Sequence, residues 1–381
     1  MKFIKTLLKW LIGIIGVLII VAYIFDYDYI LKGVHVVYFT GHKTAFIDDY
    51  PYFENDTIKK GNTTDEWPLH KDYNKSSPTK ELTTINKELG TIAYLIIKND
   101  SIWYEQYADN YSNDSKTNSF SMAKSITTSL LGKAIMDGHI KSLDQPVSDF
   151  YKEFEGAETT VGDLSSMASG LDWVESYTSP FSITARANYD DDLAETILNQ
   201  KVIKAPGQEF EYLSGSTQLL GMVIKKATGK PLADYLSESF WQPLGAKSDA
   251  LWQLDDDENK LAKAFCCISS NARDFARFGK LFKDHGKWNG NQVLDSTFVA
   301  TATQARFSGA PYGYGFWISD YLGKDIFAMR GILGQYVIVI PEDNLIVVRL
   351  GHHRSPRTIN SFPSDFYVYI DEAYEMMASR S

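Results

Sequence analysis

The stretch Phe120-Ser121-Met122-Ala123-Lys124-Ser125 begins a helical pattern that runs to Asp137 and ends before Gly138. Ser121 and Lys124 are three residues apart, so both side chains lie on one face of the predicted helix, about one turn apart. A lysine in a partly desolvated cleft can take the proton of a serine hydroxyl and make it a nucleophile. This Ser-x-x-Lys (SxxK) spacing alone does not distinguish that role from a helix N-cap beside a surface lysine.

Strand and helix patterns on both sides of this stretch indicate the fold class. Runs rich in β-forming residues precede it, three more lie near the C-terminus, and helical patterns fill the interval. We therefore predict an α+β fold, in which an antiparallel sheet formed from both ends of the globular region is flanked by helices, with a mainly helical second lobe. The expected strands are 91–97, 102–107, 326–330, 335–340 and 345–350; the expected helices are 122–137, 191–198, 216–227, 231–240, 270–283 and 364–378.

The N-terminal segment predicts a membrane span. Residues 10–25 are all apolar or Gly, with three lysines before them and two aspartates after them. Together with residues 3–8 the segment is long enough to cross a bilayer. The lysines place its N-terminal side in the cytoplasm, and so the rest of a single-pass chain on the extracytoplasmic (periplasmic) side of the cell membrane. A cleaved signal peptide is the alternative, although no small-x-small cleavage site follows.

The chain divides into three parts. Residues 1–28 are expected to be a cytoplasmic stub and transmembrane anchor (or signal peptide), residues 29–85 a connector, and residues 86–381 the globular domain. In the connector, residues 34–39 read as a short strand, and from Asp48 onward polar residues and Pro predict mostly loop.

Composition excludes several classes of protein and site. The 38 Lys and Arg against 48 Asp and Glu give a net charge of -10, which argues against a nucleic-acid partner. A bridge between the adjacent Cys266 and Cys267 would be a strained ring and could not join distant parts of the fold, so Cys266 is expected to be a small core residue. His352 and His353 have no further ligand at metal spacing, so we expect no metal.

Further motifs follow the Ser-x-x-Lys stretch along the chain. Pro206-Gly207-Gln208-Glu209-Phe210-Glu211-Tyr212-Leu213-Ser214 precedes a predicted helix, and a Gly-rich turn enters a late strand. Together these motifs resemble the serine β-lactamase and penicillin-binding-protein superfamily, and are most similar to its class C-like esterase and amidase branch, which includes the 6-aminohexanoate dimer hydrolases. The resemblance covers about residues 85–378, and its closer matches are 166–173, 273–279, 312–317 and 331–335.

The resemblance implies a set of catalytic roles. It implies that Ser121 is the acylated nucleophile, Lys124 its proton acceptor and Tyr212 a second proton relay. It implies an oxyanion hole made by the backbone N–H groups of Ser121 and Ile332, and no cofactor. Gly331 would let the substrate lie close to the strand. The other candidates for substrate binding are Ser214, Trp173, Tyr177 and Trp317, although the three aromatic residues are equally expected as packing groups.

Two departures from the family pattern bear on the substrate. Many relatives have Asn where this chain has Ser214, and relatives that act on β-lactams or cell-wall peptides have Lys or His where this chain has Met329. Arg330 replaces that cationic contact only if its side chain faces the cleft. We therefore predict a membrane-anchored serine hydrolase that cleaves a small-molecule ester or linear amide through a Ser121 acyl-enzyme. The alternatives are a β-lactamase or D-alanyl-D-alanine carboxypeptidase-like enzyme, and a catalytically idle relative that binds peptides or cell-wall fragments.

Overall fold

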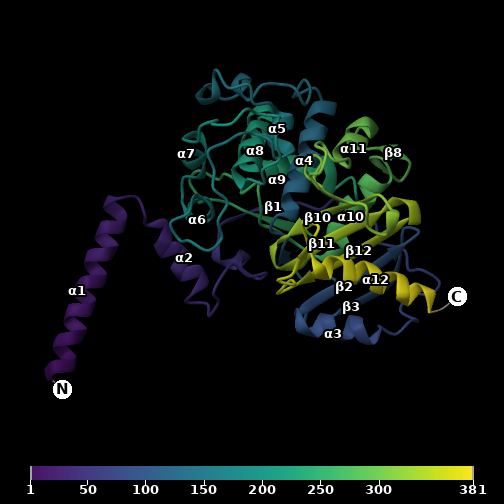
Figure 1. The fold of residues 1–381 in the computed structure, drawn as a ribbon, viewed down its shortest axis with the longest axis horizontal. Coiled ribbons are helices and arrows are strands. Elements are labelled where there is room, and N and C mark those ends of the chain that lie inside the picture. The colour runs from purple at the N-terminus through teal and green to yellow at the C-terminus, as the bar shows by residue number, and fades with distance from the viewer. Residues whose placement is uncertain (1, 380–381) are drawn as a thin grey trace.

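A six-stranded antiparallel sheet joins the two ends of the globular region, as predicted (Figure 1). The computed structural model describes residues 2–379. The strand order is β3-β2-β12-β11-β10-β9, so the N-terminal hairpin lies beside the last long strand of the chain. The strands are β2 (Thr91–Lys98), β3 (Ser101–Tyr107), β9 (Trp317–Ser319), β10 (Ile326–Gly331), β11 (Gln335–Ile340) and β12 (Leu345–Gly351).

The central strands β11 and β12 are buried on both faces because helices cover the sheet from either side. Alternate residues of a strand point to opposite faces. Val337 and Val348 therefore belong to one core cluster, with α10 (Ala272–Lys283), and Ile338 and Val347 belong to the other, with α3 (Lys80–Glu88) and α12 (Ser364–Ala378). The predicted helices at 270–283 and 364–378 are confirmed.

The second lobe is mainly helical and is centred on α4 (Met122–Met136), which is buried along most of its length. α4 packs against α8 (Ser214–Thr228) and against β10, so it connects the lobe to the sheet. The predicted helix at 231–240 is α9 (Leu232–Leu236) followed by a π-helical turn. The remaining helices of the lobe are α5 (Val161–Ser165), α6 (Ile183–Tyr189), α7 (Leu193–Leu198) and α11 (Ser296–Ala302). The predicted α+β class is confirmed.

A small four-stranded sheet supports the start of α4. Its order is β1-β5-β6-β4, and β4 leads directly into Ser121. Because β1 comes from residues 29–85, the predicted connector shares a sheet with the domain; the three-part division of the chain stays a prediction. The strands are β1 (Asn55–Ile58), β4 (Thr117–Asn118), β5 (Ala250–Gln253) and β6 (Ile268–Ser270), and two short pairs lie elsewhere, β7 (Lys287–Trp288) with β8 (Asn291–Gln292) and β13 (Thr358–Ile359) with β14 (Phe362–Pro363).

Two helices precede the domain. α1 (Lys2–Ile24) has 23 residues, none of them buried, and projects away from the globular part (Figure 1). Its mean hydropathy of 2.5 and its length suit a membrane span, and a signal sequence passes the same test. The strand predicted at 34–39 is wrong, because α2 (Tyr29–Val37) is a helix. Its valines favour a strand locally, but burial of Tyr29, Val36 and Val37 on one face stabilises the helix.

Candidate active site

Ser121 stands at the N-cap of α4, and its hydroxyl makes no capping hydrogen bond. The chain turns sharply into this position, since Phe120 has a φ of 45°, in the left-handed region that a bulky side chain seldom adopts. The side chain of Asn118 holds the turn by accepting a hydrogen bond of 2.8 Å from the N–H of Phe120. Strain of this kind persists where the surroundings fix it, as at functional sites. The turn leaves the Ser121 hydroxyl available for other partners.

Lys124 is buried directly beside Ser121, with 1% of its surface exposed. Its Nζ lies 3.2 Å from Ser121 Oγ, 3.2 Å from Ser214 Oγ and 2.8 Å from the carbonyl oxygen of Phe265. Burial lowers the pKa of Lys124 to about 8, and the charge of Glu175 opposes this shift. A lysine with such a pKa is partly neutral near pH 7 and can accept a proton.

Tyr212 completes the group of side chains around Ser121. Its ring lies 5.1 Å from Lys124 Nζ and packs against Trp317, at 5.3 Å between ring centroids. Burial raises the pKa of Tyr212 well above its usual value, although a hydrogen bond with Ser121 and the charge of Arg330 oppose the rise. Tyr212 is therefore a neutral phenol near pH 7, suited to donate a proton, and Lys124 is the better base.

Glu175 is the functional candidate that the sequence did not suggest. Its carboxylate accepts hydrogen bonds from the backbone N–H and the hydroxyl of Ser214, both at 2.7 Å, and from Trp173 Nε1 at 2.8 Å. The hydroxyl of Tyr177 donates to the same carboxylate. The signal in the sequence is slight: Glu175 follows a quoted family stretch by two residues. Through Ser214 it fixes one neighbour of Lys124.

A small cavity opens on the Tyr212 side of Ser121, with a volume of about 630 Å³ that includes solvent at its mouth; we call it the arginine-side cavity. The Arg330 guanidinium lies in its wall, 3.3 Å from the centre of the Trp317 ring, and donates to the carbonyl oxygen of Ser361. Burial lowers the pKa of Arg330 to about 10. The lining residues are Ser121, Tyr177, Tyr212, Trp317, Arg330, Gly331, Ile332 and Arg354.

The structure brings most of the predicted substrate-binding residues to Ser121. Tyr177, Trp317 and Gly331 line the arginine-side cavity, and Ser214 contacts Lys124. A Cβ added to Gly331 would lie 2.3 Å from the carbonyl oxygen of Ser119, so this glycine is required by close packing. Trp173 is different: it is buried, its ring packs against the backbone beside Ser214, and it does not line the cavity.

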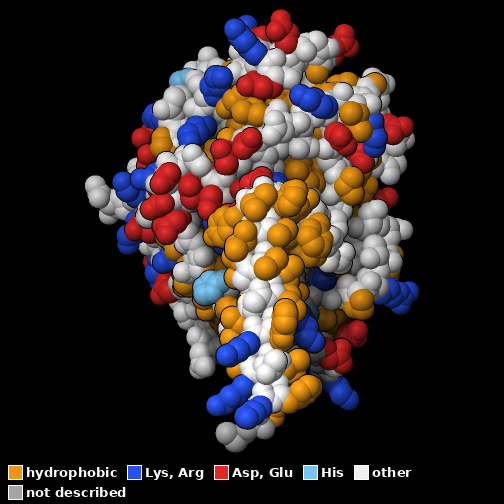
Figure 2. All heavy atoms as spheres, turned by 90° about the vertical axis from the view of Figure 1, so that its left-hand side faces the viewer, with side chains coloured by type: hydrophobic (Ala, Val, Ile, Leu, Met, Phe, Trp, Pro, Cys, Tyr) orange, Lys and Arg blue, Asp and Glu red, His pale blue; other side chains and the backbone are white. Residues whose placement is uncertain are grey.

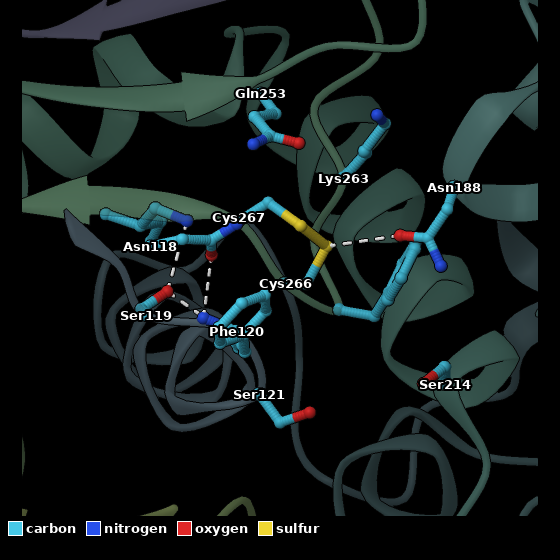
Figure 3. Close-up of a disulfide and its surroundings, with 12 residues drawn as sticks. Asn118, Ser119, Phe120, Ser121, Asn188, Ser214, Gln253, Lys263, Cys266 and Cys267 are labelled. Atoms are coloured by element: carbon cyan, nitrogen blue, oxygen red, sulfur yellow. Dashed lines mark hydrogen bonds between the residues drawn. A yellow bond between two sulfur atoms is a disulfide. The ribbon is translucent and has the colours of Figure 1, made fainter. Parts of the chain in front are cut away.

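Cys266 and Cys267 form a disulfide, contrary to the expectation that Cys266 is simply a small core residue. Both are buried, and their bridge spans one peptide bond, so it does not join distant segments. Both cysteines line a second cavity, described below, that Ser121 and Ser214 also line, and Figure 3 shows the four residues together. Phe265, whose carbonyl group accepts the hydrogen bond from Lys124, directly precedes the pair.

Comparison with known proteins decides the family. The family model described as Beta-lactamase matches residues 80–360. The chain belongs to the beta-lactamase family. This beta-lactamase-family chain is 25% identical, over 298 residues, to the 6-aminohexanoate-dimer hydrolase of Paenarthrobacter ureafaciens, an alignment that covers 71% of this chain and 75% of the relative. The resemblance inferred from the motifs is confirmed.

Solved structures of the family share its fold. A Bacillus anthracis protein assigned as a 6-aminohexanoate-dimer hydrolase superposes with a TM-score of 0.74 at 19% identity, covering 92% of this chain and 94% of the other. A family VIII carboxylesterase superposes with a TM-score of 0.63 at 17% identity, covering 82% and 99%. The chain is thus a hydrolase of the beta-lactamase family, with amidases and esterases among its neighbours.

Proposed function

We propose that this chain is a membrane-anchored serine hydrolase that cleaves an ester or a linear amide through an acyl-enzyme on Ser121. The observation that carries the proposal is the placement of Lys124. Its Nζ lies 3.2 Å from Ser121 Oγ at a buried position, where the loss of hydration lowers its pKa to about 8. A serine next to a partly neutral lysine is an activated nucleophile.

The proposed mechanism has two halves. In the first, Ser121 Oγ attacks the carbonyl carbon while Lys124 takes the hydroxyl proton, and the N–H groups of Ser121 and Ile332 stabilise the oxyanion. Tyr212 gives its proton to the leaving alcohol or amine and regains one from Lys124. In the second, water attacks the ester formed on Ser121, with Lys124 and Tyr212 again moving the proton. Ser121 and Ile332 both line the arginine-side cavity, which supports their shared role.

The substrate class rests on the relatives and on the departures in the motifs. The name of the Paenarthrobacter relative describes hydrolysis of a linear amide, and a carboxylesterase shares the fold. Met329 stands where relatives that act on β-lactams have Lys or His, and it is buried, with 1% of its surface exposed. These features favour an ester or a linear amide.

A second candidate substrate is a β-lactam or another acidic amide. Arg330 favours it, because its guanidinium lines the cavity beside Ser121 and can bind a carboxylate. A direct comparison of p-nitrophenyl acetate with a chromogenic cephalosporin distinguishes the two substrate classes. We expect a higher kcat/KM for the ester; a higher value for the β-lactam would overturn our choice, and no turnover of either, with no adduct on Ser121, would favour the idle relative.

A further inference from the structure

A second cavity extends from Ser121 toward the N-terminal helices. It is open to solvent at its mouth, and the space between its walls, including that solvent, is about 1150 Å³. Ser121, Ser214 and Ile332 lie at its catalytic end, and residues of α2, among them Ile30 and Val34, lie at its far end. We call it the membrane-side cavity.

The walls of the membrane-side cavity suit a hydrocarbon chain. Most of their surface is apolar, contributed by α2, by α6 and by the segment that carries the disulfide. Two polar side chains of its lining are already paired: Asp49 accepts hydrogen bonds from Asn118 and Gln253, and Asn188 donates to a backbone carbonyl. An apolar ligand therefore leaves these two side chains with their partners.

The mouth of the cavity lies next to the predicted membrane span. α2 begins five residues after α1 ends, and contacts hold the junction to the domain: Arg186 of α6 donates to Asp26 at 2.5 Å and its guanidinium lies 4.6 Å from the Tyr29 ring. The rings of Tyr27 and Phe181 are 5.8 Å apart. Figure 2 shows the apolar side chains along α1, with lysines at its N-terminal end, in front of the globular part.

Exposed apolar side chains lie within or close to the segments that line this cavity. After α2, Tyr38 and Phe39 are 63% and 79% exposed; before α6, Val174 and Phe181 are 73% and 68% exposed. Tyr38 is of a type that is enriched where a protein meets the headgroup region of a membrane. α1 is about 34 Å long at about 1.5 Å per residue, which is enough to cross the hydrocarbon core of a bilayer, and α2, which lines the cavity, follows it directly in the chain.

We propose that the substrate carries a long hydrocarbon acyl chain, and that this chain reaches Ser121 from the membrane surface through the membrane-side cavity. The proposal rests on the proposed function. Tyr212, which protonates the leaving group, lines the arginine-side cavity and not the membrane-side cavity. The leaving group therefore occupies the arginine side, and the acyl group occupies the membrane side.

The reaction itself is ordinary acyl transfer to water. The bond from Ser121 Oγ to the acyl carbon forms, the bond from that carbon to the leaving oxygen or nitrogen breaks, and the serine proton passes through Lys124 and Tyr212 to the leaving group. Water then releases a fatty acid and restores the serine hydroxyl. Each methylene that enters the cavity is expected to raise kcat/KM about fourfold, until the cavity is filled.

A chain-length series tests the proposal on the full chain in detergent micelles. With p-nitrophenyl esters from acetate to decanoate, we expect kcat/KM to rise with acyl length. Val34→Trp, which fills the far end of the cavity, should abolish this rise. His35→Trp is the matched control, because His35 is the exposed next residue of α2 and does not line the cavity. Val34→Phe, a smaller change, should shorten the preferred chain.

Three results would overturn the proposal. The first is a wild-type kcat/KM that does not change with acyl length. The second is a kcat/KM of Val34→Trp that still rises with acyl length as in the wild type. The third is a kcat/KM that rises with the length of the alcohol in alkyl acetates and not with the length of the acyl chain. If the wild type hydrolyses p-nitrophenyl acetate but its kcat/KM does not rise with acyl length, only this inference is contradicted. If no ester is hydrolysed and no adduct forms on Ser121, the proposed function is contradicted as well.

The route from the membrane has its own test. The full chain is reconstituted in phosphatidylcholine vesicles that also hold p-nitrophenyl palmitate, and compared with a mixture of ester-loaded vesicles and separate protein-bearing vesicles. We expect at least tenfold faster release of p-nitrophenol when ester and protein share a bilayer. Equal rates in the two arrangements would show that the ester arrives from solution and would contradict the membrane route.

Discussion

At the scale of single residues, the chemistry of the site depends on the environment of Lys124. An ordinary lysine with a pKa near 10.4 is neutral in only about one molecule in 2500 at pH 7. With a pKa of about 8, roughly one in ten is neutral. Burial thus increases the population of the base form by more than two orders of magnitude, while Glu175 keeps the shift from going further.

Replacing Lys124 tests its role as the base. We expect Lys124→Ala to lower the rate of Ser121 acylation by about 10²–10⁴, because a positioned general base contributes about that much. In the wild type, the rate should rise with pH and level off above a midpoint near 8, as Lys124 loses its proton. Stopped-flow acylation by p-nitrophenyl acetate measures both.

The control for this variant is Lys133→Ala, since Lys133 lies on the same helix and pairs with Asp137. It should acylate at the wild-type rate. A wild-type rate in Lys124→Ala, with unchanged circular dichroism, would show that the role is misassigned.

Glu175 is predicted to raise the pKa of Lys124, so its replacement should shift that pKa in a known direction. Its negative charge favours the ammonium form and raises the pKa of Lys124. Glu175→Gln removes that charge, so the pKa of Lys124 should fall and the midpoint of the pH profile should move to lower pH. Asp172→Asn, an exposed carboxylate three residues earlier, should leave the midpoint in place. If the midpoint does not move in Glu175→Gln, Glu175 does not affect the pKa of Lys124 and serves only to position Ser214.

At the scale of elements, the end of β10 is packed against the turn that presents the nucleophile. A Cβ on Gly331 would lie 2.3 Å from the carbonyl oxygen of Ser119, and Ser119 is itself fixed by a 2.7 Å hydrogen bond to the carbonyl of Ile268. Because both sides of the contact are backbone, neither yields easily. Gly331 therefore sets the distance between β10 and the start of α4.

We expect Gly331→Ala to destabilise the domain by about 1–3 kcal/mol, as overpacking does, and to slow the labelling of Ser121 at temperatures where the domain is folded. Chemical denaturation and the rate of labelling measure the two effects. Gly61→Ala is the control, since the nearest atom to an added Cβ is 3.4 Å away. Wild-type stability in Gly331→Ala would contradict the close packing.

Elements with strong periodicity could be predicted from the sequence, and those fixed by distant contacts could not. The strands 326–330, 335–340 and 345–350 are runs of β-forming residues bounded by turns, and all three are present. The sequence did not predict α2, because its valines locally favour a strand, whereas its packing against α6 stabilises a helix. Glu175 was missed because its contact with the active site runs through Ser214, 39 residues away, and no local pattern marks that contact.

The same distinction holds for the candidate site. Ser121, Lys124 and Tyr212 lie in motifs with fixed spacing, and the structure brings all three together. For Trp173 the sequence left two roles open, substrate binding and packing, and its side chain lies in the core. The direction in which a loop side chain points depends on packing against residues that are distant in the sequence. A local motif does not reveal that packing.

At the scale of the whole molecule, Ser121 lies between two cavities of different character. The arginine-side cavity contains Arg330 and Arg354, whereas the membrane-side cavity is mostly apolar and reaches α2. Such an arrangement suits an amphiphilic substrate with its scissile bond at the junction. The contact of Arg186 with Asp26 connects the segment between α1 and α2 to α6, which lines the membrane-side cavity.

Whether α1 is a membrane anchor is tested by asking if the mature protein keeps residues 1–28. We expect the full chain to remain in membranes after carbonate extraction, with the mature protein retaining residues 1–28, and a variant without residues 2–25 to be released. N-terminal sequencing and fractionation measure this. A mature N-terminus beyond residue 28 would instead identify α1 as a cleaved signal peptide.

The role of Ser121 as the nucleophile is tested most directly by mass spectrometry of the protein after treatment with a fluorophosphonate probe. We expect one adduct per chain, located on Ser121 in the peptide map, absent in Ser121→Ala and formed much more slowly in Lys124→Ala. No adduct on the folded wild-type protein, or an adduct on a different residue, would contradict it.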